Sequence, residues 1–367
     1  MAVSTSVAGT TPIETAPATT ARPSRSGPVT ALILVLSAVL GAAGTAYLAA
    51  AGTSLGSQLD AADLWFRENH PALRPVELGY EAARAWSAAA LGLLAVAWLL
   101  SGLAVRRGVA VKWLLLVGLF WSVPLLIGPP LFTADPWFYT AIGAAVQNGV
   151  DPFQYGPGVL GDVEVVRGAE RFWRFSPTPY SPPFVSLLSG LSWLFDEDLL
   201  SVLVAVRVLS VAGWAVCALL VCRIAARLGG SPAVAMWLGG INPLVLVHLV
   251  SGNHNDALML ALLLPGLLLA LYNHPLLGIL LCVAGAGIKA TALIAVLVIG
   301  VDWAQRQDGW PARLRCLVLA GGLGAGAFAL SVQLTGWGWT FLDNLDTPGK
   351  ALEALNEASL AAVHSPD

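Results

Sequence analysis

Long runs of apolar residues limit what this chain can fold into more than any other feature of its sequence. About 20 predominantly apolar residues are needed to cross the hydrocarbon core of a bilayer. Hydrophobic residues make up 57% of the chain and charged residues only 11%, against roughly 25% charged residues in soluble domains. We therefore predict an all-α, polytopic bundle of transmembrane helices. Seven runs are long enough to span: 29–51, 86–105, 113–132, 199–222, 232–250, 256–272 and 315–335.

Two other apolar segments are ambiguous, and the excess of Lys and Arg in cytoplasmic loops decides both. Residues 183–195 are predicted to lie along the outer interface, because a full crossing would put Arg223 and Arg227 outside. Residues 275–304 are predicted to form two short helices that turn at 285–289. That turn keeps the arginines that follow the segment in the cytoplasm. The result is a chain of about nine spans.

The same rule orients the chain, because Arg22 and Arg25 put the N-terminus in the cytoplasm. Residues 1–28 are rich in Ser, Thr, Ala and Pro, and are predicted to be a disordered cytoplasmic tail. Residues 29–340 form the transmembrane domain, and 341–367 an external tail. The external loops hold most of the polar residues that a simple helix bundle does not require: 52–85, 133–198 (with the long loop 133–182 at its start), 251–255 and 336–367.

The segment "TADPWFY" follows the third span and carries Asp135. One interpretation is structural: Asp135 caps a helix whose first position is Pro136, and the aromatic residues, Tyr139 among them, form an interfacial belt. The other is catalytic: a carboxylate at the water boundary, with its pKa raised by apolar surroundings, could act as a general base. The two interpretations are compatible, because a helix N-terminus also holds a carboxylate in place. The second Asp-Pro, at Asp151, indicates a turn.

A cluster of polar residues occupies the external turn between two apolar runs, in "VSGNHNDALM". Gly252 and one capping residue would be enough for a helix hairpin, so the polar residues from 253 to 256 exceed that need. His254, Asn255 and Asp256 are therefore candidate site residues, although a cap and a hydrogen-bonded histidine remain the alternative. His248, six residues earlier, is predicted to be buried and hydrogen-bonded.

Two cations lie within apolar runs, where charges are costly and tend to mark functional sites. Lys289 stands at a glycine-rich turn near the outer leaflet, which suits a point charge that holds a phosphate. Arg207 could act likewise, but snorkelling to the outer interface is favoured for it. The four cysteines all fall in or beside apolar runs and are predicted to be core residues, not disulfides or metal ligands: Cys217, Cys222, Cys282 and Cys316.

Aromatic residues, arginines and prolines alternate in the external segment "RFWRFSPTPYSPPF", residues 171–184. Its prolines make the segment stiff. Rings such as Tyr180 could stack on the apolar faces of a sugar, or could anchor the segment at the membrane interface. The formal net charge of −3 gives no indication of a nucleic-acid partner.

These pieces, in this order, resemble the type C glycosyltransferase superfamily. More narrowly, they are similar to the polyprenol-phosphate-mannose-dependent α-1,6-mannosyltransferases of actinobacteria. The stretches "ADPWFYTAIGAAVQNGVDPFQYGPGVLG", "SPTPYSPPF", "NPLVLVHLVSGNHNDALM", "GIKATAL" and "GWGWTFLDNLDTPGK" carry the likeness, which runs from residue 29 to about 350. Members of that family continue with further spans beyond this point, so the resemblance implies C-terminal helices that this sequence does not contain.

The resemblance implies a multi-pass enzyme of the plasma membrane with its active face outside. Its donor would be the lipid polyprenyl-phosphate-mannose, its acceptor an α-1,6-mannan or lipoglycan of the cell envelope, and membrane lipids would surround it. Asp135 matches the proposed base, and Lys289 the cation for the departing phosphate. His254 and Asp256 would line the same chamber, with Asn255, Tyr139 and Tyr180 as further substrate contacts. No cofactor is expected, and a divalent metal is left open.

Two other classes of function are weighed beside the enzyme. A transporter or channel would use intramembrane Lys289, Arg207 and His248 as pathway residues. Transporters commonly show internal repeats and helices broken at mid-depth, whereas here no repeat is evident and the polar residues gather outside. The third class is an inactive remnant that binds lipid or a partner protein.

Overall fold

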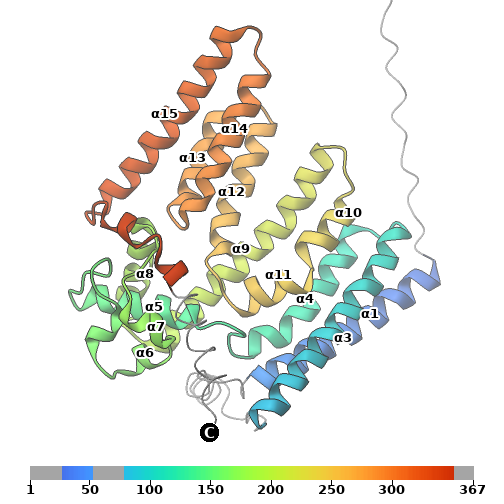
Figure 1. The fold of residues 1–367 in the computed structure, drawn as a ribbon. Coiled ribbons are helices and arrows are strands. Elements are labelled where there is room, and N and C mark those ends of the chain that lie inside the picture. Colours follow the sequence, from blue (N-terminus) through green and yellow to red (C-terminus); the bar gives the residue numbers. More distant parts are fainter. Residues whose placement is uncertain (1–26, 53–77, 351–367) are drawn as a thin grey trace, which may run out of the picture.

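Every regular element in the described part of the chain is a helix, which confirms the predicted all-α class (Figure 1). The computed structural model describes residues 27–52 and 78–350. The predicted tail 1–28, apart from its last two residues, and the end of the predicted tail 341–367 lie outside that range, as does the central part of the loop 52–85. The domain boundaries stay predictions.

Four helices are long and apolar enough to cross a membrane: α1 (Pro28–Gly52), α3 (Tyr80–Arg106), α9 (Leu199–Arg227) and α15 (Trp310–Leu334). A fifth candidate is bent by 48° between its two halves, Pro232–Gly240 and Pro243–Ser251. These halves comprise α10 (Pro232–Ala235), η3 (Met236–Gly240), α11 (Pro243–Val245) and η4 (Leu246–Ser251), and we call them together the broken helix. The break falls at Asn242-Pro243, because proline cannot donate the backbone hydrogen bond that would continue a helix.

The other predicted spans form shorter apolar helices of 12 to 17 residues. At about 1.5 Å per residue such helices reach roughly 18–26 Å, less than the ~30 Å hydrocarbon core. A helix stands at each of the nine predicted places, but the number that cross a membrane stays a prediction. The shorter helices are α4 (Val111–Ile127), α12 (Asp256–Leu271), α13 (Pro275–Ala286) and α14 (Leu293–Gln305).

The predicted division of residues 275–304 is confirmed. Helix α13 ends at Ala286, and the short 3₁₀ turn η5 (Ala290–Ala292) leads into α14. Lys289 lies between them in extended conformation, with φ −147° and ψ 117°. The two helices therefore form a hairpin whose turn presents this lysine.

The segments at the described ends of the loops predicted to share one face gather at one end of the helices. In Figure 1 the C-terminal ends of α1 and α4, the start of α3 and the end of α15 all lie at the lower side, together with the helices between α4 and α9. Those intervening helices are α5 (Asp135–Gln147), α6 (Glu164–Arg167), α7 (Arg171–Phe175) and α8 (Pro182–Leu194). These segments therefore share one face. That this face lies on the external side of the membrane stays a prediction.

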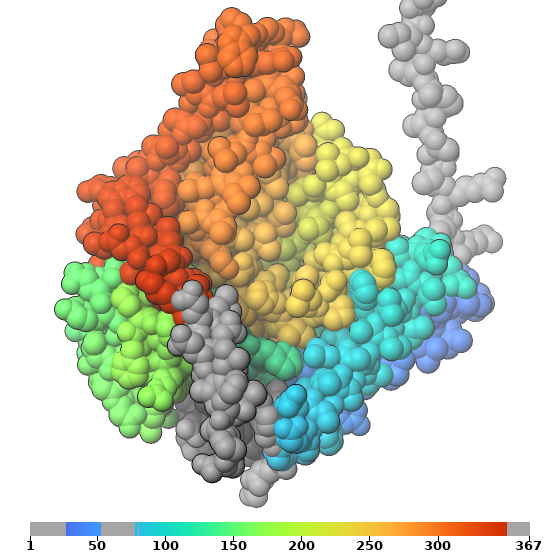
Figure 2. Space-filling view, viewed as in Figure 1, coloured from blue at the N-terminus to red at the C-terminus, as the bar shows by residue number. Residues whose placement is uncertain are grey.

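Two packed clusters of buried side chains divide the helices into two groups. One cluster is formed by α1, α3, α4, the C-terminal half of α9 and the broken helix, around Trp121 and Trp214. The other is formed by α5, α8 and the helices from α12 to α15, around Phe184 and Ile279. Figure 2 shows the second group as the green and orange regions and the first as the blue, cyan and yellow ones. The common end of the helices lies where the two groups meet.

Glycines allow α12 and α13 to pack with their backbones in contact. A Cβ atom on Gly278 would lie 2.5 Å from the carbonyl oxygen of Gly266, and one on Gly266 would lie 2.7 Å from the carbonyl oxygen of Gly278. Small residues at helix interfaces permit such close approach in membrane proteins. This contact holds α12, which begins at Asp256, against α13, which leads into the turn that carries Lys289.

Candidate active site

Helix α5 positions Asp135, but not as the predicted cap. The helix begins at Asp135 itself, with Ala134 before it and no side-chain capping bond, so the prediction that Asp135 caps the helix is wrong. The Thr133 hydroxyl accepts a hydrogen bond from the backbone N–H of Asp135 at 3.1 Å. The carboxylate is thereby left for other partners.

The aromatic residues after Asp135 do not form an interfacial belt. The side chains of Trp137, Phe138 and Tyr139 are 2%, 3% and 1% exposed, because α5 is enclosed by the protein. Phe138 and Tyr139 pack in the cluster with Phe184 of α8. The prediction of an interfacial belt is wrong for these three residues, and their rings fix the helix that presents Asp135.

Asp135 and His254 form a hydrogen-bonded pair. The distance from His254 Nδ1 to Asp135 Oδ2 is 2.8 Å, and the side chains are 19% and 28% exposed, respectively. Burial acts to raise the pKa of Asp135, but the hydrogen bond and charge of His254 and the hydrogen bond of Tyr139 outweigh it, so this pKa lies below its ordinary value. The sequence led us to expect that apolar surroundings raise the pKa of Asp135. In the structure this pKa is lowered, so Asp135 is a weaker base than predicted.

Tyr139 joins the helix to the polar turn. Its hydroxyl donates to Asp135 Oδ2 at 2.9 Å and accepts from the backbone N–H of Asn255 at 3.3 Å. Burial and the charges of Tyr180 and Asp135 raise the pKa of Tyr139 well above its usual value, so it remains a neutral donor. Tyr180 packs edge-on against Tyr139, with ring centroids 5.5 Å apart. The Asn255 side chain is only 3% exposed, and its amide nitrogen has no hydrogen-bond partner.

A second pair, between Lys289 and Asp256, joins the α12 start to the α13–α14 turn. Lys289 Nζ donates to both carboxylate oxygens of Asp256, at 2.9 and 3.0 Å. His248 Nε2 lies 3.7 Å from Asp256 Oδ2, and its side chain is 43% exposed. The prediction that His248 is buried is therefore wrong. It lies within the π-helical turn η4. Sequence spacing gives no signal for that geometry, which is frequent at functional sites.

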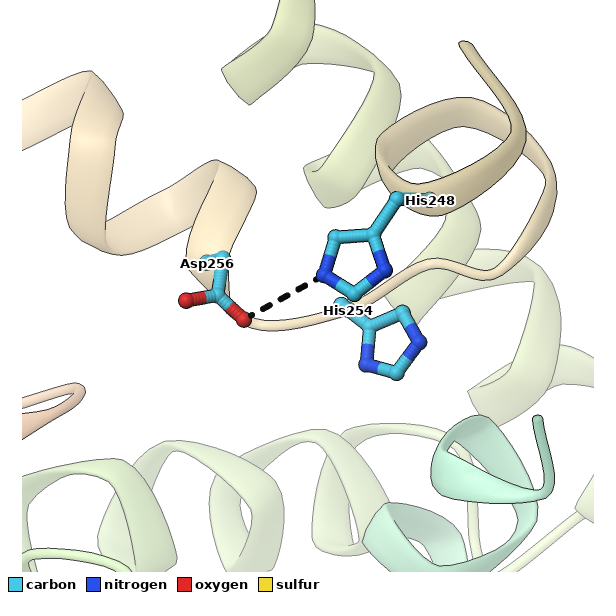
Figure 3. Close-up of side chains that lie close together, drawn as sticks. All are labelled: His248, His254 and Asp256. Carbon is cyan, nitrogen blue, oxygen red and sulfur yellow. Dashed lines mark ion pairs between the residues drawn. The ribbon is translucent and has the colours of Figure 1, made fainter. Parts of the chain in front are cut away.

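The Asp135–His254 pair and the Asp256–Lys289 pair meet through stacked histidines. The rings of His248 and His254 have centroids 3.8 Å apart and planes inclined by 16°. Figure 3 shows the two rings one above the other, beside Asp256. One connected network thus runs from Asp135 through His254 and His248 to Asp256 and Lys289. We call these five residues the polar network.

The stacking decides against a single metal ion bound by both histidines. One ligand atom each from His248, His254 and Asp256 lies within 4.8 Å of the others, which is close enough for a metal site. An imidazole nitrogen, however, binds a metal in the plane of its ring. Because the two ring planes are nearly parallel and stacked, one of the rings would have to rotate before both could bind the same ion. Lys289 also occupies both oxygens of Asp256.

Arg207 supports the turn that carries the polar network. Its side chain is 5% exposed and donates to the carbonyls of Leu126 and Gly128, at 2.8 and 2.6 Å, at the end of α4. Neither snorkelling nor phosphate contact fits this burial. Asn253 adopts φ +52° in the turn. With its amide oriented to satisfy both neighbours, it accepts from Arg207 Nε at 3.1 Å and donates to the Val250 carbonyl at 2.8 Å.

The structure brings all the predicted site residues to one place. Asp135, Tyr139, His254 and the backbone of Asn255 are hydrogen-bonded together, Tyr180 packs on Tyr139, and Asp256 with Lys289 lies next to them. Their catalytic and substrate-binding roles stay predictions. Asp151 forms the predicted turn instead, since its Oδ1 accepts from the Phe153 N–H at 2.9 Å. The four cysteines are buried and free, as predicted.

Residues 38–305 match the family described as "Alpha-(1->6)-mannopyranosyltransferase, N-terminal domain". The chain belongs to this family. The matched range contains the whole polar network, the candidate membrane helices α3 and α9, the broken helix and the second half of α1. Membership therefore includes the part of the fold on which the candidate active site depends.

Named relatives agree with the family. The chain is 28% identical over 272 residues to "Alpha-(1->6)-mannopyranosyltransferase A" of Mycobacterium tuberculosis, covering 70% of this chain and 50% of the relative. It is 33% identical over 174 residues to the protein of the same name from Corynebacterium glutamicum, covering 47% and 35%. "Alpha-(1->6)-mannopyranosyltransferase B" of the latter organism is 30% identical over 202 residues, covering 50% and 33%. The chain thus spans at most about half the length of these relatives. No solved structure matches it.

Proposed function

We propose that this chain is an integral membrane mannosyltransferase. It transfers mannose from polyprenyl-phosphate-mannose to an α-1,6-mannan or lipoglycan acceptor, at the outer face of the plasma membrane. The polar network is the observation that carries the proposal, because it joins a carboxylate–imidazole pair to a lysine at the common end of apolar helices. The names of the relatives support mannosyl transfer.

Asp135 and His254 together accept the proton of the acceptor hydroxyl. Because Nδ1 of His254 is bound to Asp135 at 2.8 Å, Nε2 is the nitrogen left to receive a proton. A carboxylate that binds one imidazole nitrogen fixes the tautomer and stabilises the imidazolium that forms. The catalytic role predicted for Asp135 is thereby refined. Asp135 orients the His254 ring and stabilises its protonated form, while His254 takes the proton.

The transfer needs one displacement. The acceptor oxygen forms a bond to the anomeric carbon of mannose, the bond from that carbon to the phosphate oxygen breaks, and its electron pair leaves on the phosphate. The hydroxyl proton goes to His254. Charge develops on the departing phosphate, and cations placed there stabilise the transition state.

Lys289 supplies that cation. Its ammonium has three donors and a side chain 39% exposed, so it can turn a donor toward a phosphate while it keeps its bond to Asp256. Asp256 in turn holds the lysine in place. Tyr180 is proposed to contact the sugar, whereas Tyr139 and Asn255, 1% and 3% exposed, are proposed to hold Asp135 and the turn in place.

The arrangement favours an enzyme over a transporter. The network lies at the helix ends, beside α5 and the turn at 251–255, and not at the middle of the candidate membrane helices. Transport pathways place their polar sites near the bilayer midplane. The N-terminus on the cytoplasmic side, which puts the network outside, remains part of the proposal.

Transfer is tested in membranes that contain the expressed chain and lack other mannosyltransferases. Radiolabelled polyprenyl-phosphate-mannose and an α-1,6-mannoside acceptor are supplied, and labelled oligosaccharide is counted. We expect transfer by the wild type and a strong loss in His254→Gln. Absence of transfer by the wild type would sink the enzyme proposal for this chain.

A further inference from the structure

An apolar groove leads away from the polar network. It has a volume of about 440 Å³ and lies between α3, the segment after α4 and the broken helix. Leu91 and Ala95 line it from α3, Leu131 and Phe132 from the end of the α4 segment, and Leu244 and Val247 from the broken helix. Among its lining residues the only titratable groups are His248 and His254. One end of the groove is thus polar and the rest is hydrocarbon.

An imidazole lies at that polar end, and the ammonium of Lys289 lies near it on the other side of Asp256. His248 is 43% exposed and Lys289 39% exposed, and both contact Asp256. The Lys289 ammonium has three donors and an imidazole has one, so both side chains can donate a hydrogen bond to a phosphate. Arg and Lys are common phosphate partners, and a lysine acts there as a point charge. The groove therefore suits a ligand with a phosphate at one end and a long apolar chain.

A second groove lies on the same side of the broken helix. This apolar groove, of about 550 Å³, lies further along α3, between Leu99, Leu103 and Trp237 of the broken helix. Both grooves follow the seam between α3 and the broken helix. Trp98 and Trp237 fasten this seam: their rings are stacked at 4.6 Å, and each indole N–H donates to the other residue's carbonyl at 2.8 and 2.9 Å.

We propose that the groove of Leu91, Ala95, Leu131 and Leu244 holds the first isoprene units of a polyprenyl phosphate. His248 then lies beside Lys289 at the phosphate. This inference rests on the proposed function, because it assigns the lipid part of the donor to a place in the fold. It adds His248 as a phosphate-contacting residue. It also gives a role to the break at Asn242-Pro243, since the half Pro243–Ser251 lines the groove. A two-chain phospholipid is the competing occupant.

Binding tests the proposal without any transfer step. Purified protein in detergent is titrated with polyprenyl phosphate, and bound lipid is counted by native mass spectrometry. Ala95→Trp fills the groove and is expected to weaken binding at least tenfold. Gly92→Trp, on the same helix with open space around its Cβ, is the matched control and is expected to bind like the wild type. Equal binding by Ala95→Trp and Gly92→Trp overturns the proposal.

Three further measurements keep the result independent of misfolding. Wild-type protein is photolabelled with a diazirine-bearing farnesyl phosphate, which is expected to label the peptides of Leu91, Leu131 or Leu244; labelling confined to other helices overturns the proposal. His248→Gln is expected to weaken binding of polyprenyl phosphate and not of the uncharged polyprenol. Equal competition by phosphatidylglycerol also overturns it, because the groove then holds bulk lipid.

The two proposals fail separately. If the wild type binds polyprenyl phosphate in this groove but transfers no mannose, the lipid site stands and the proposed activity does not. If the wild type transfers mannose while photolabel falls elsewhere, the activity stands and the lipid site does not.

Discussion

The exchange of Asp135 for asparagine separates a positioning carboxylate from a catalytic base. Asparagine keeps the shape and one oxygen, so it can still accept from Tyr139 and His254, but it removes the negative charge. Hydrogen bonds to charged groups contribute about 1.5–3 kcal/mol and neutral ones about 0.5–1.5 kcal/mol. The charge thus accounts for roughly 1 kcal/mol in each of two bonds. About 2 kcal/mol corresponds to a loss of roughly 30-fold in rate, at 1.36 kcal/mol for each factor of ten.

His254→Gln should cost more, because removal of a general base typically lowers the rate by about 10²–10⁴-fold. Initial rates of mannose transfer at saturating donor are measured for both variants. Asp151→Asn is the matched control: Asp151 lies in the same loop and holds a turn that asparagine also forms, so its rate should equal that of the wild type. A loss above 10³-fold in Asp135→Asn, with a mild loss in His254→Gln, would reverse the assignment of the base.

Four further predictions concern the supports of the site. Lys289→Gln should raise the KM for the lipid donor by about 10–100-fold, the worth of one charged hydrogen bond, and Lys289→Arg should recover part of it in the same donor titration. Arg207→Met orphans buried carbonyls and should lower the free energy of unfolding by about 3 kcal/mol or more, measured by thermal unfolding in detergent. Because the pKa of Asp135 is lowered, its contribution to stability is present above about pH 4 and is lost as the pH falls through the lowered value. The difference in Tm between wild type and Asp135→Asn should therefore shrink as the pH falls from about 4 through the lowered pKa of Asp135. Finally, cysteine at position 162 should react with an impermeant maleimide from outside intact cells, and cysteine at 308 only after permeabilisation, since the four native cysteines are buried; the reverse pattern would refute the orientation.

Much of the fold could be predicted because hydrophobic length is a strong signal. The long helices and the division of 275–304 follow from run lengths and from arginine positions, which are properties of the local sequence. The bend of the broken helix also has a local cause, the Asn242-Pro243 step. The number of crossings does not follow, because 12-residue α13 and 13-residue α14 are set by packing against their neighbours and not by bilayer thickness.

The candidate site could be predicted as a set of residues, but not as a network. Asp135 and His254 stood out because polar residues at the ends of apolar runs are unusual. Their pairing depends on contacts across 119 positions of sequence, which no local pattern reveals. His248 was misjudged because helical spacing places it one turn and a half from His254, whereas the π-helical turn stacks the two rings. Trp137 was misjudged because interfacial and enclosed aromatics look alike in sequence.

The ion pair of Asp256 and Lys289 is a poor device for stability, which strengthens its assignment to function. The lysine and aspartate side chains are 39% and 23% exposed, so part of their hydration is lost, and such pairs often contribute little net free energy. An apolar pair of similar volume would join α12 to the α13–α14 turn with a smaller loss of hydration. Gly266 and Gly278 already bring α12 and α13 into backbone contact. A charged pair that is not needed for packing, placed where a groove, two histidines and a carboxylate meet, fits a site that must bind and release an anion.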